Sequence, residues 1–375
     1  MKDKKILFII HRLYFKAIPK LGGIDRIITF LKGNNKITLI EHPFEKINHP
    51  SVLTSKNVIY QHCSFFKIPF VWIEEFAINI IWVLKSHTRY DLAIASDPLN
   101  FFSIYFLKKL GLVKKIQFHS TDYSSRRFNN LLLDTIYQYL YHFSLKRADC
   151  VTVVSQRMLN HAYNIVSFND QSKIFLLPNS PYFAKIPKMQ LEKGEINQSQ
   201  LVILSGIFEN QVDMDNLLLF LKLIKKQYPD IILNIIGHVE NNSIEVFIQN
   251  GFKNNLVFHG NLPYEKAVER MAQSYIGITS YKKSHSYMYY ADSLKIREYA
   301  AAGLPVVCDN IYGTAEEVKK YDAGFVYSTA QEMATAVDQL MSNKKLYQTK
   351  SEHALSWAKK MDKKKLLREL YGKLL

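Results

Sequence analysis

The chain has only three cysteines among 375 residues, and Cys63, Cys150 and Cys308 lie far apart. An odd, widely spaced set predicts no disulfide framework and favours a reducing cytoplasm, where each thiol is a small buried side chain. The histidines and cysteines show no zinc-ligand spacing either. We therefore expect a protein without a metal site.

Long apolar runs are missing too. The run at residues 6–10 ends at His11 and is too short for the apolar core of a signal peptide. A later apolar stretch, residues 68–84, is interrupted by Glu74 and Glu75 and is shorter than the about 20 residues that a membrane span needs. The sequence predicts no transmembrane helix.

Charge is unevenly spread. The net charge is +16, and residues 1–184 hold 24 Lys and Arg against 12 Asp and Glu, whereas residues 185–375 hold 25 against 21. A basic first half indicates an anionic partner, which can be a nucleic acid, an anionic membrane or a phosphate-bearing acceptor.

One stretch, residues 275–307, organises the second half of the chain. Its apolar start at residues 275–279 predicts a strand, a tyrosine-rich loop follows, and Asp292 and Ser293 offer oxygen atoms that cap the next helix. That helix ends at Gly303, and an apolar run opens another strand. This is a βαβ unit, and ligands of such sheets bind at the carboxyl ends of the strands.

Two charged residues in this helix admit two interpretations. Lys295 lies in the first turn, where the positive end of the helix dipole favours phosphate, and Glu298 follows on the same side. Such a pair is typical of a solvated helix face. It also suits a nucleotide-linked ligand, with the cation on phosphate and the carboxylate on sugar hydroxyls.

Residues 292–307 resemble the nucleotide-sugar signature of glycosyltransferases with the GT-B fold, especially the family 4-like enzymes that include sucrose and mannosyl synthases. The Ser-Leu-Lys step also resembles the phosphate-contacting loop of the xanthan glucuronosyltransferase. The resemblance implies that Glu298 binds the donor ribose and that Ser293, Leu294 and Lys295 lie at the donor. It further implies an α/β fold of two Rossmann-like domains, whose parallel sheets face an inter-domain cleft.

Two more residues join the predicted donor site. Gly206 ends the apolar run at 201–206, which predicts the first strand of the second domain. Tyr281 follows the strand predicted at 276–279, where its ring can stack on a nucleobase.

The loop after Gly206 departs from the resembling enzymes, which bring an Arg and a Lys to the diphosphate there. Residues 207–215 contain neither. We then expect the donor phosphates to be bound by Lys295, by helix N–H groups and by Lys282 or Lys283.

The Asp-Met-Asp step at Asp213 and Asp215 matches the metal-binding motif of the other glycosyltransferase fold. Both residues stand where a helix is predicted to begin, over residues 216–227. That position favours helix capping over metal binding.

The first half also alternates strands and helices. Strands are predicted at 4–10, 36–41, 58–61 and 91–96, with helices at 24–31 and 70–85. Gly22 and Gly23 precede the first helix, and the resemblance places their loop at the cleft. Asp97, which starts the helix after the strand at 91–96, is a further cleft candidate.

The helix at 70–85 has an apolar stripe that predicts packing on the sheet, made by Ile73, Phe76, Ala77, Ile80, Ile81 and Leu84. Trp72 and Trp82 leave a membrane-interface alternative open. Four lysines around the next helix end fit the helix dipole or a membrane patch, namely Lys108, Lys109, Lys114 and Lys115.

A second polar stretch, residues 116–128, places His119, Asp122, Arg126 and Arg127 after a short strand. Glycosyltransferases that the chain resembles carry a His or Asp in this loop. By that likeness Asp122 deprotonates an acceptor hydroxyl, His119 bonds the donor sugar and the arginines hold an acceptor phosphate. A loop or capping role for Asp122 and a structural role for His119 stay open.

These observations predict a glycosyltransferase that moves a sugar from a UDP- or GDP-sugar to a glycan or lipid-linked acceptor, without a metal, in bacterial surface polysaccharide assembly. We expect a cytoplasmic protein, at the inner face of the membrane. The expected layout is an acceptor domain (1–184), a linker (185–200), a nucleotide-sugar domain (201–355) and a C-terminal helix that crosses back (356–375).

Two other functions compete with this prediction. The basic half suits nucleic acid, but aromatic and basic residues are not interleaved as a stacking platform and no nucleic-acid motif is present, so no nucleic acid is expected. A catalytically silent GT-B scaffold is the other alternative, because the Arg and Lys after Gly206 are missing.

Overall fold

The computed structural model describes most of the chain, namely residues 3–15, 18–19, 22–44, 49–56, 58–128, 130–189, 199–204, 206–207, 211–283 and 286–375. The chain divides into two compact units, of which the first contains Met1–Leu177 and Lys364–Leu375 and the second contains Pro178–Lys363. Of the predicted linker, residues 190–198 lie outside the described part of the chain.

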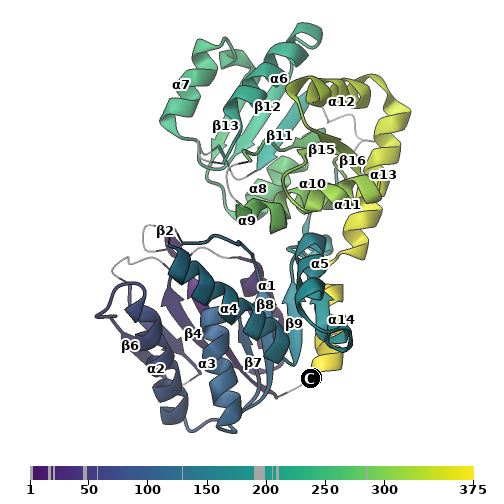
Figure 1. The fold of residues 1–375 in the computed structure, drawn as a ribbon. Coiled ribbons are helices and arrows are strands. Elements are labelled where there is room, and N and C mark those ends of the chain that lie inside the picture. The colour runs from purple at the N-terminus through teal and green to yellow at the C-terminus, as the bar shows by residue number, and fades with distance from the viewer. Residues whose placement is uncertain are drawn as a thin grey trace. The chain divides into compact units, whose positions relative to one another are not determined.

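The first unit is built on an eight-stranded sheet with the order β10-β9-β8-β7-β1-β4-β5-β6 (Figure 1). All neighbouring strands are parallel except the pairs β4–β5 and β5–β6. The strands are β1 Lys5–Arg12, β4 Lys36–Pro43, β5 Ser51–Thr54, β6 Ile59–His62, β7 Tyr90–Ala95, β8 Val113–Ser120, β9 Cys150–Val153 and β10 Ile174–Leu176, beside a short pair β2 Tyr14–Phe15 and β3 Ile18–Pro19.

Four of these strands, β1, β4, β6 and β7, confirm the strands predicted from the apolar runs of the first half. The sequence does not predict β5, because four residues with polar ends are too few to show a period. The central strand β1 is buried on both faces, as its continuous apolar run predicts.

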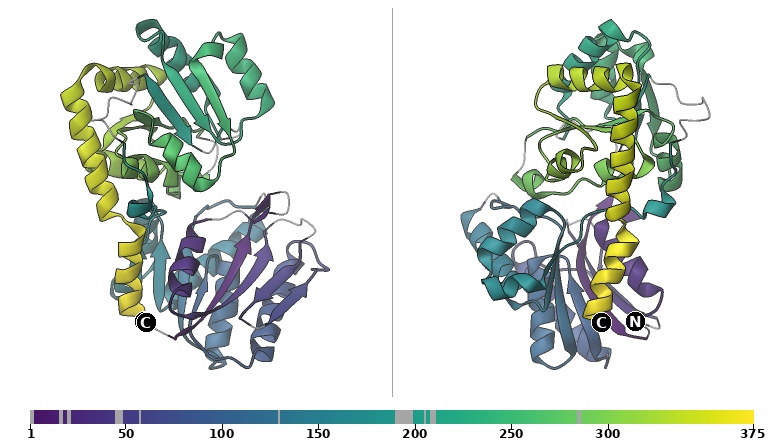
Figure 2. Two further views of the ribbon diagram at one scale, coloured as in Figure 1. Left: turned by 180° about the vertical axis from the view of Figure 1, so that it is seen from behind. Right: turned by 90° about the vertical axis from the view of Figure 1, so that its right-hand side faces the viewer.

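Helices cover both faces of this sheet. On one face, α1 (Gly23–Lys32) and α14 (Lys363–Leu374) pack together, with Ile27 and Leu367 in one cluster with Phe8 (Figure 2). On the other face lie α2 (Phe70–Lys85), α3 (Pro98–Lys109) and α4 (Leu131–Arg147). There Phe101 of α3 meets Phe118 of β8, with ring centroids 5.6 Å apart. The fifth helix, α5 (Gln156–Ile165), contacts β9 and β10.

The helix α2 has the predicted bounds but turns the opposite face to the sheet. Ile73 and Leu84 of the predicted packing stripe are exposed, and the buried face consists of Glu75, Ile78, Asn79, Trp82 and Val83. The predicted packing is therefore wrong. The helix is apolar almost all round, so the positions of two polar residues decide its orientation, and both have buried partners in the first unit.

The second unit has a six-stranded, fully parallel sheet with the order β13-β12-β11-β14-β15-β16. The strands predicted at 201–206, at 276–279 and after Gly303 are confirmed as β11 Gln200–Leu204, β14 Ile276–Ile278 and β15 Val306–Asp309. The other three strands are β12 Ile232–Ile236, β13 Leu256–Gly260 and β16 Gly324–Tyr327.

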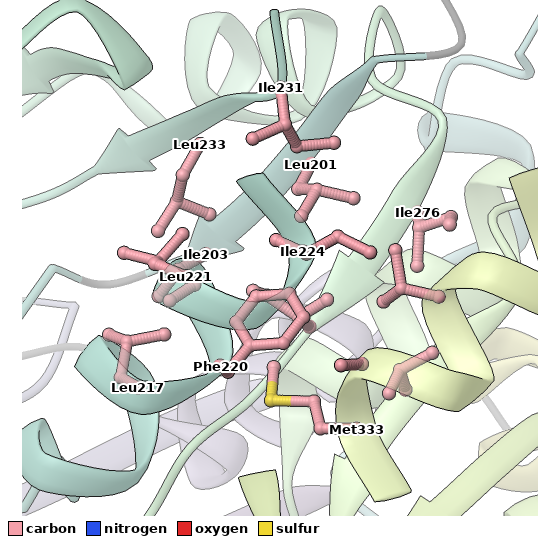
Figure 3. Close-up of a cluster of buried hydrophobic side chains, with 14 of the residues drawn as sticks. Leu201, Ile203, Leu217, Phe220, Leu221, Ile224, Ile231, Leu233, Ile276 and Met333 are labelled. Carbon is pink, nitrogen blue, oxygen red and sulfur yellow. The ribbon is translucent and has the colours of Figure 1, made fainter. Parts of the chain in front are cut away.

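Two helices, α6 (Met214–Gln227) and α12 (Ala330–Ser342), close one face of this sheet. Figure 3 shows Phe220 and Ile224 of α6 packed beside Met333 and the strand residue Ile203. The other face carries α8 (Tyr264–Met271), α10 (Leu294–Ala302) and α13 (Lys344–Lys360). Shorter helices complete the unit, namely α7 Asn241–Gln249, α9 Ser286–Tyr290 and α11 Thr314–Lys320. No helix in the described ranges is long and apolar enough to cross a membrane.

Candidate functional site

A buried cluster of charges fixes the start of α10. Ser293 makes no side-chain capping bond with the described residues, and the carboxylate of Asp292 accepts hydrogen bonds from Arg297 Nη2 (2.8 Å) and Thr314 Oγ1 (2.7 Å). The same Nη2 also donates to Glu317 Oε1 at 2.5 Å, and Nη1 donates to Glu317 Oε2 at 3.2 Å. The predicted capping is therefore wrong, because the buried guanidinium of Arg297 takes Asp292 as one of its carboxylate partners.

Two further hydrogen bonds tie the residues at the start of α10 to other parts of the second unit. The N–H of Ser293 donates to Thr314 Oγ1 at 2.8 Å, and the N–H of Asn179 donates to Asp292 Oδ2 at 2.6 Å. The helix ends at Gly303, whose φ of 87° is the left-handed conformation that favours glycine. A helix of nine residues is thus held at both ends.

Lys295, in that first turn, holds its ammonium 5.0 Å from the centre of the Tyr281 ring. Tyr281 is only 6% exposed, and its ring also packs edge-on against Tyr312. Burial lowers the pKa of Lys295 to about 8, against the opposite effect of the carboxylates of Glu298 and Asp309. The ammonium is therefore a partly desolvated cation, which interacts strongly with any anion that reaches it.

Glu298, one turn further along α10, is buried and accepts a hydrogen bond from the phenol of Tyr264 on α8 at 2.7 Å. The spacing of Lys295 and Glu298 is therefore not that of a solvated helix face. The sequence does not single out Tyr264, because a tyrosine at the start of a short amphipathic helix carries no signal of its own.

Gly206 lines a pocket together with Tyr281 and Lys295. Its φ is +76°, and a Cβ there would stand 1.8 Å from the carbonyl oxygen of His238, so the position requires glycine. The pocket of the second unit is lined by Ile203, Leu204, Gly206, Gln211, Val212, Ile278, Thr279, Ser280, Tyr281, Lys295 and Tyr299. Gly206, Tyr281 and Lys295, predicted from separate parts of the sequence, are therefore brought together.

The two loops at this pocket are joined by backbone hydrogen bonds. The N–H of Lys282 donates to the carbonyl of Gln211 at 2.7 Å, and Val212 pairs with Tyr281 as an isolated bridge. Leu294 and Lys282 are half-buried and Lys283 is exposed.

The Asp-Met-Asp step begins a helix, as predicted. Asp213 is the N-cap of α6 and accepts a hydrogen bond from the N–H of Asn216 at 3.1 Å, while Asp215 lies in the first turn. Within the described part of the chain, no group of three His, Cys, Asp or Glu side chains is arranged to hold a metal ion.

In the first unit, Asp97 forms a buried network that the sequence does not reveal. It caps α3 through Asn100 and accepts a bond from His11 Nδ1 at 3.0 Å, and the Nε2 of the same ring lies 3.1 Å from Glu75. Burial would lower the pKa of His11, but the two carboxylates raise it to about 10. The pKa of Asp97 falls to about 2, since the nearby imidazolium outweighs burial.

Asp122 and Arg127 form a bidentate ion pair, with N–O distances of 2.9 and 3.2 Å. The guanidinium also lies over the rings of Tyr137 (5.1 Å) and Phe44 (5.7 Å), and Phe44 contacts the ring of His11. His11 and Arg127 therefore both contact the ring of Phe44, so the Asp97–His11 and Asp122–Arg127 pairs lie in one region of the first unit.

The remaining predicted residues are buried in the core, exposed, or at the start of a helix. His119 is fully buried in β8 and bonds Thr152 Oγ1 at 2.9 Å, which favours the structural role left open by the sequence. Arg126 is exposed. Gly22 is the N-cap of α1 and Gly23 is its first residue.

Comparison with known protein families gives a match in the second half of the chain. Residues 187–357 match the model of the family described as glycosyl transferases group 1. No curated protein sequence matches the chain significantly.

Solved structures with similar folds extend the likeness to the whole chain. The HepE protein of Anabaena, solved with UDP, has a TM-score of 0.71 at 14% identity and aligns over 98% of each chain. Sucrose-phosphate synthase from Thermosynechococcus elongatus gives 0.71 at 13%, over 99% of this chain and 98% of its own. TarM of S. aureus, solved with UDP and a GlcNAc-glycerol, gives 0.59 at 12%, over 87% of this chain, which spans only 61% of TarM.

The two α/β units, of which one has a mostly parallel and the other a fully parallel sheet, thus have the GT-B fold that the sequence resemblance implies. Residues 187–357 match the glycosyl transferases group 1 model, which supports a glycosyltransferase, and the chain as a whole has the GT-B fold.

Proposed function

We propose that the pocket at the start of α10 binds the nucleotide of a nucleotide-sugar donor, and that the enzyme transfers this sugar to a glycan or lipid-linked acceptor. One observation carries the proposal. A desolvated ammonium and a buried carboxylate, those of Lys295 and Glu298, lie one turn apart on a helix whose N-terminus adjoins a pocket.

The diphosphate is assigned to the first turn of α10. Its N–H groups and the ammonium of Lys295 supply positive charge at one place, and both stabilise phosphate oxygens. Because these groups supply the charge that a divalent cation would otherwise provide, we propose a metal-independent enzyme. Lys282 is a second candidate for binding the phosphate. It lies in the loop after β14, and its backbone N–H donates to the carbonyl of Gln211.

The ribose of the nucleoside is assigned to Glu298, one helical turn beyond the pocket residue Lys295. Glu298 accepts hydrogen bonds from ribose hydroxyls, and the phenol of Tyr264 holds its carboxylate in place. Gly206 in the pocket lining allows close approach of backbone to the ligand, and Ser293 and Leu294 stand beside Lys295 at the start of α10. The HepE structures hold UDP or UDP-glucose, which supports a UDP-sugar as the donor.

The acceptor is assigned to the first unit. We propose that Asp122 removes the proton from the acceptor hydroxyl, and that Arg127 fixes the position of its carboxylate. The basic charge of this half suits a phosphate-bearing acceptor. The proposed setting is bacterial surface polysaccharide assembly at the cytoplasmic face of a membrane.

A melting-temperature screen with UDP, GDP, CMP and their sugars tests donor binding, because a ligand at ~100-fold its Kd adds about 2.7 kcal/mol to stability. We expect UDP to raise the melting temperature. No shift with any of these nucleotides would contradict the proposal.

Asp122→Asn tests the acceptor side. Turnover should fall about 100- to 10,000-fold with donor affinity kept, as expected for loss of a general base. Asp170→Asn, at an exposed carboxylate of the same unit, is the matched control and should leave turnover unchanged. Normal turnover in Asp122→Asn would remove this residue from the chemistry.

A further inference from the structure

Three neighbouring helices of the first unit turn apolar stripes to the outside. On α2 the exposed stripe contains Phe70, Ile73, Ile81 and Leu84, spaced by helical periods. This stripe includes residues that the sequence assigns to the core, and they are left uncovered because the opposite side of α2 packs on the sheet.

The stripes on α3 and α4 continue this surface. Phe102 and Phe106 are exposed one turn apart on α3, and Leu132, Ile136 and Tyr139 are exposed on α4. The three helices contact one another in the order α2, α3, α4 and lie side by side in Figure 1.

Aromatic contacts close the grooves between these helices. The ring of Phe76 on α2 lies 5.5 Å from Phe102 and 5.6 Å from Phe106, and Phe102 lies 5.9 Å from Phe143 of α4. The result is one broad apolar surface, which we call the α2–α4 face. Contiguous apolar surfaces of this kind mark a binding surface in soluble proteins.

The acidic residues of the three helices are all withdrawn from this surface. Glu75 binds His11, Glu74 lies 2.7 Å from His62, and Asp134 accepts the backbone N–H of Arg127. None of these three carboxylates is exposed.

The exposed charges of the same helices are cations. They stand in the last turns, and they are Lys85, Lys109, Lys146 and Arg147. The α2–α4 face therefore combines exposed aromatic and aliphatic side chains with positive charges at the C-terminal ends of its helices. This is the composition of surfaces that lie in the interface of an anionic bilayer.

We propose that the α2–α4 face binds the surface of an anionic lipid bilayer. Its apolar stripes lie at the boundary between headgroups and acyl chains, and its cations contact the headgroups. A second copy of the chain is disfavoured, because its own α2–α4 face exposes no carboxylate on these helices that could pair with the cations. The inference rests on the proposed function in one respect, since a lipid-linked acceptor is presented at such a surface.

Co-sedimentation with vesicles tests the proposal. The full chain should bind vesicles of phosphatidylcholine mixed with phosphatidylglycerol, and it should bind phosphatidylcholine alone more weakly. Binding should also weaken with salt, because each Lys or Arg near an anionic surface contributes about 1 kcal/mol, or roughly fivefold. Lys85→Gln with Lys109→Gln should lower the partition coefficient, whereas Lys222→Gln with Lys226→Gln, exposed on α6, should not.

The apolar stripe is tested by Ile73→Glu with Leu84→Glu, which should lower vesicle binding at least about tenfold. The matched control is Ile248→Glu with Leu219→Glu, which changes the same two residue types at exposed sites of the second unit and should bind as the wild type does. All variants should keep the UDP-induced melting shift of the wild type.

Two outcomes overturn the inference. One is wild-type protein that does not sediment with anionic vesicles, including the case where it forms a dimer that Ile73→Glu with Leu84→Glu dissociates. The other is a loss of binding that is equal for the face variant and its control. Vesicle binding without any nucleotide-induced shift would instead contradict the proposed function and leave the membrane surface standing.

Discussion

The ammonium of Lys295 lies 5.0 Å from the centre of the Tyr281 ring, at the N-terminal turn of α10. This contact joins the loop after β14 to α10. A cation over an aromatic face is attracted by the ring, and here it also loses hydration because the site is buried. The contact therefore places at the wall of the pocket a cation that can lose its proton at mildly alkaline pH.

The pH dependence of donor binding should report on Lys295. Its pKa in the free protein is lowered to about 8, chiefly by burial. Below that pH the ammonium is charged and UDP affinity should be constant. Above it, the Kd should rise by about tenfold per pH unit, since the proton must be regained for the diphosphate to bind.

Titration of UDP into Lys295→Arg between pH 7 and 10 provides the comparison. Arginine stays charged over this range, so its affinity should be flat with pH. Lys266→Gln, at an exposed lysine of α8, should follow the wild-type curve. A wild-type profile that is flat would exclude Lys295 from the phosphate site.

Removing Arg297 should destabilise the second unit strongly. Arg297→Ala leaves Asp292 and Glu317 buried without their shared guanidinium, and loss of one partner of a buried ion pair costs about 3–5 kcal/mol. Lys266→Ala breaks an exposed pair with Glu269 and should cost at most about 1 kcal/mol. Urea unfolding measures both variants, and equal losses would show that the cluster does not hold α10.

The His11 network should give a pH-dependent contribution to stability. The folded pKa of about 10 lies above the ordinary value of 6.5, so the contribution is fully present below pH 6.5 and is lost as pH rises through about 10. The difference in unfolding free energy between wild type and His11→Gln should therefore be constant under acidic conditions and shrink above pH 6.5.

Denaturation at several pH values checks this, with His353→Gln as the control at an exposed histidine. That control should show little change at any pH. A difference for His11→Gln that grows between pH 6.5 and 10 would mean that the imidazole is neutral in the folded protein.

Much of the fold could be predicted because its strands are buried on both faces. Continuous apolar runs such as residues 6–10 mark these strands without any tertiary information. Periodicity did not predict the buried face of α2, because this helix is apolar on almost all sides. The orientation of α2 depends on where Glu75 and Asn79 find partners, and those partners come from β1 and β4.

The candidate site was predictable only where local rules apply. Lys295 and Glu298 follow from helix spacing and resemblance, and Gly206 ends a strand. Asp292 was misassigned because capping is a local preference, whereas its buried partners, Arg297 and Thr314, become visible only in the fold. Long-range partners such as Tyr264 leave no pattern in the sequence.

Calorimetric titration of UDP into wild type and Glu298→Ala tests the central claim most directly. If Glu298 holds the ribose, the variant should bind at least about tenfold more weakly, because a hydrogen bond to a charged group contributes about 1.5–3 kcal/mol. Glu245→Ala, at an exposed carboxylate of α7, should bind UDP as the wild type does. Equal affinity of wild type and Glu298→Ala would contradict the account.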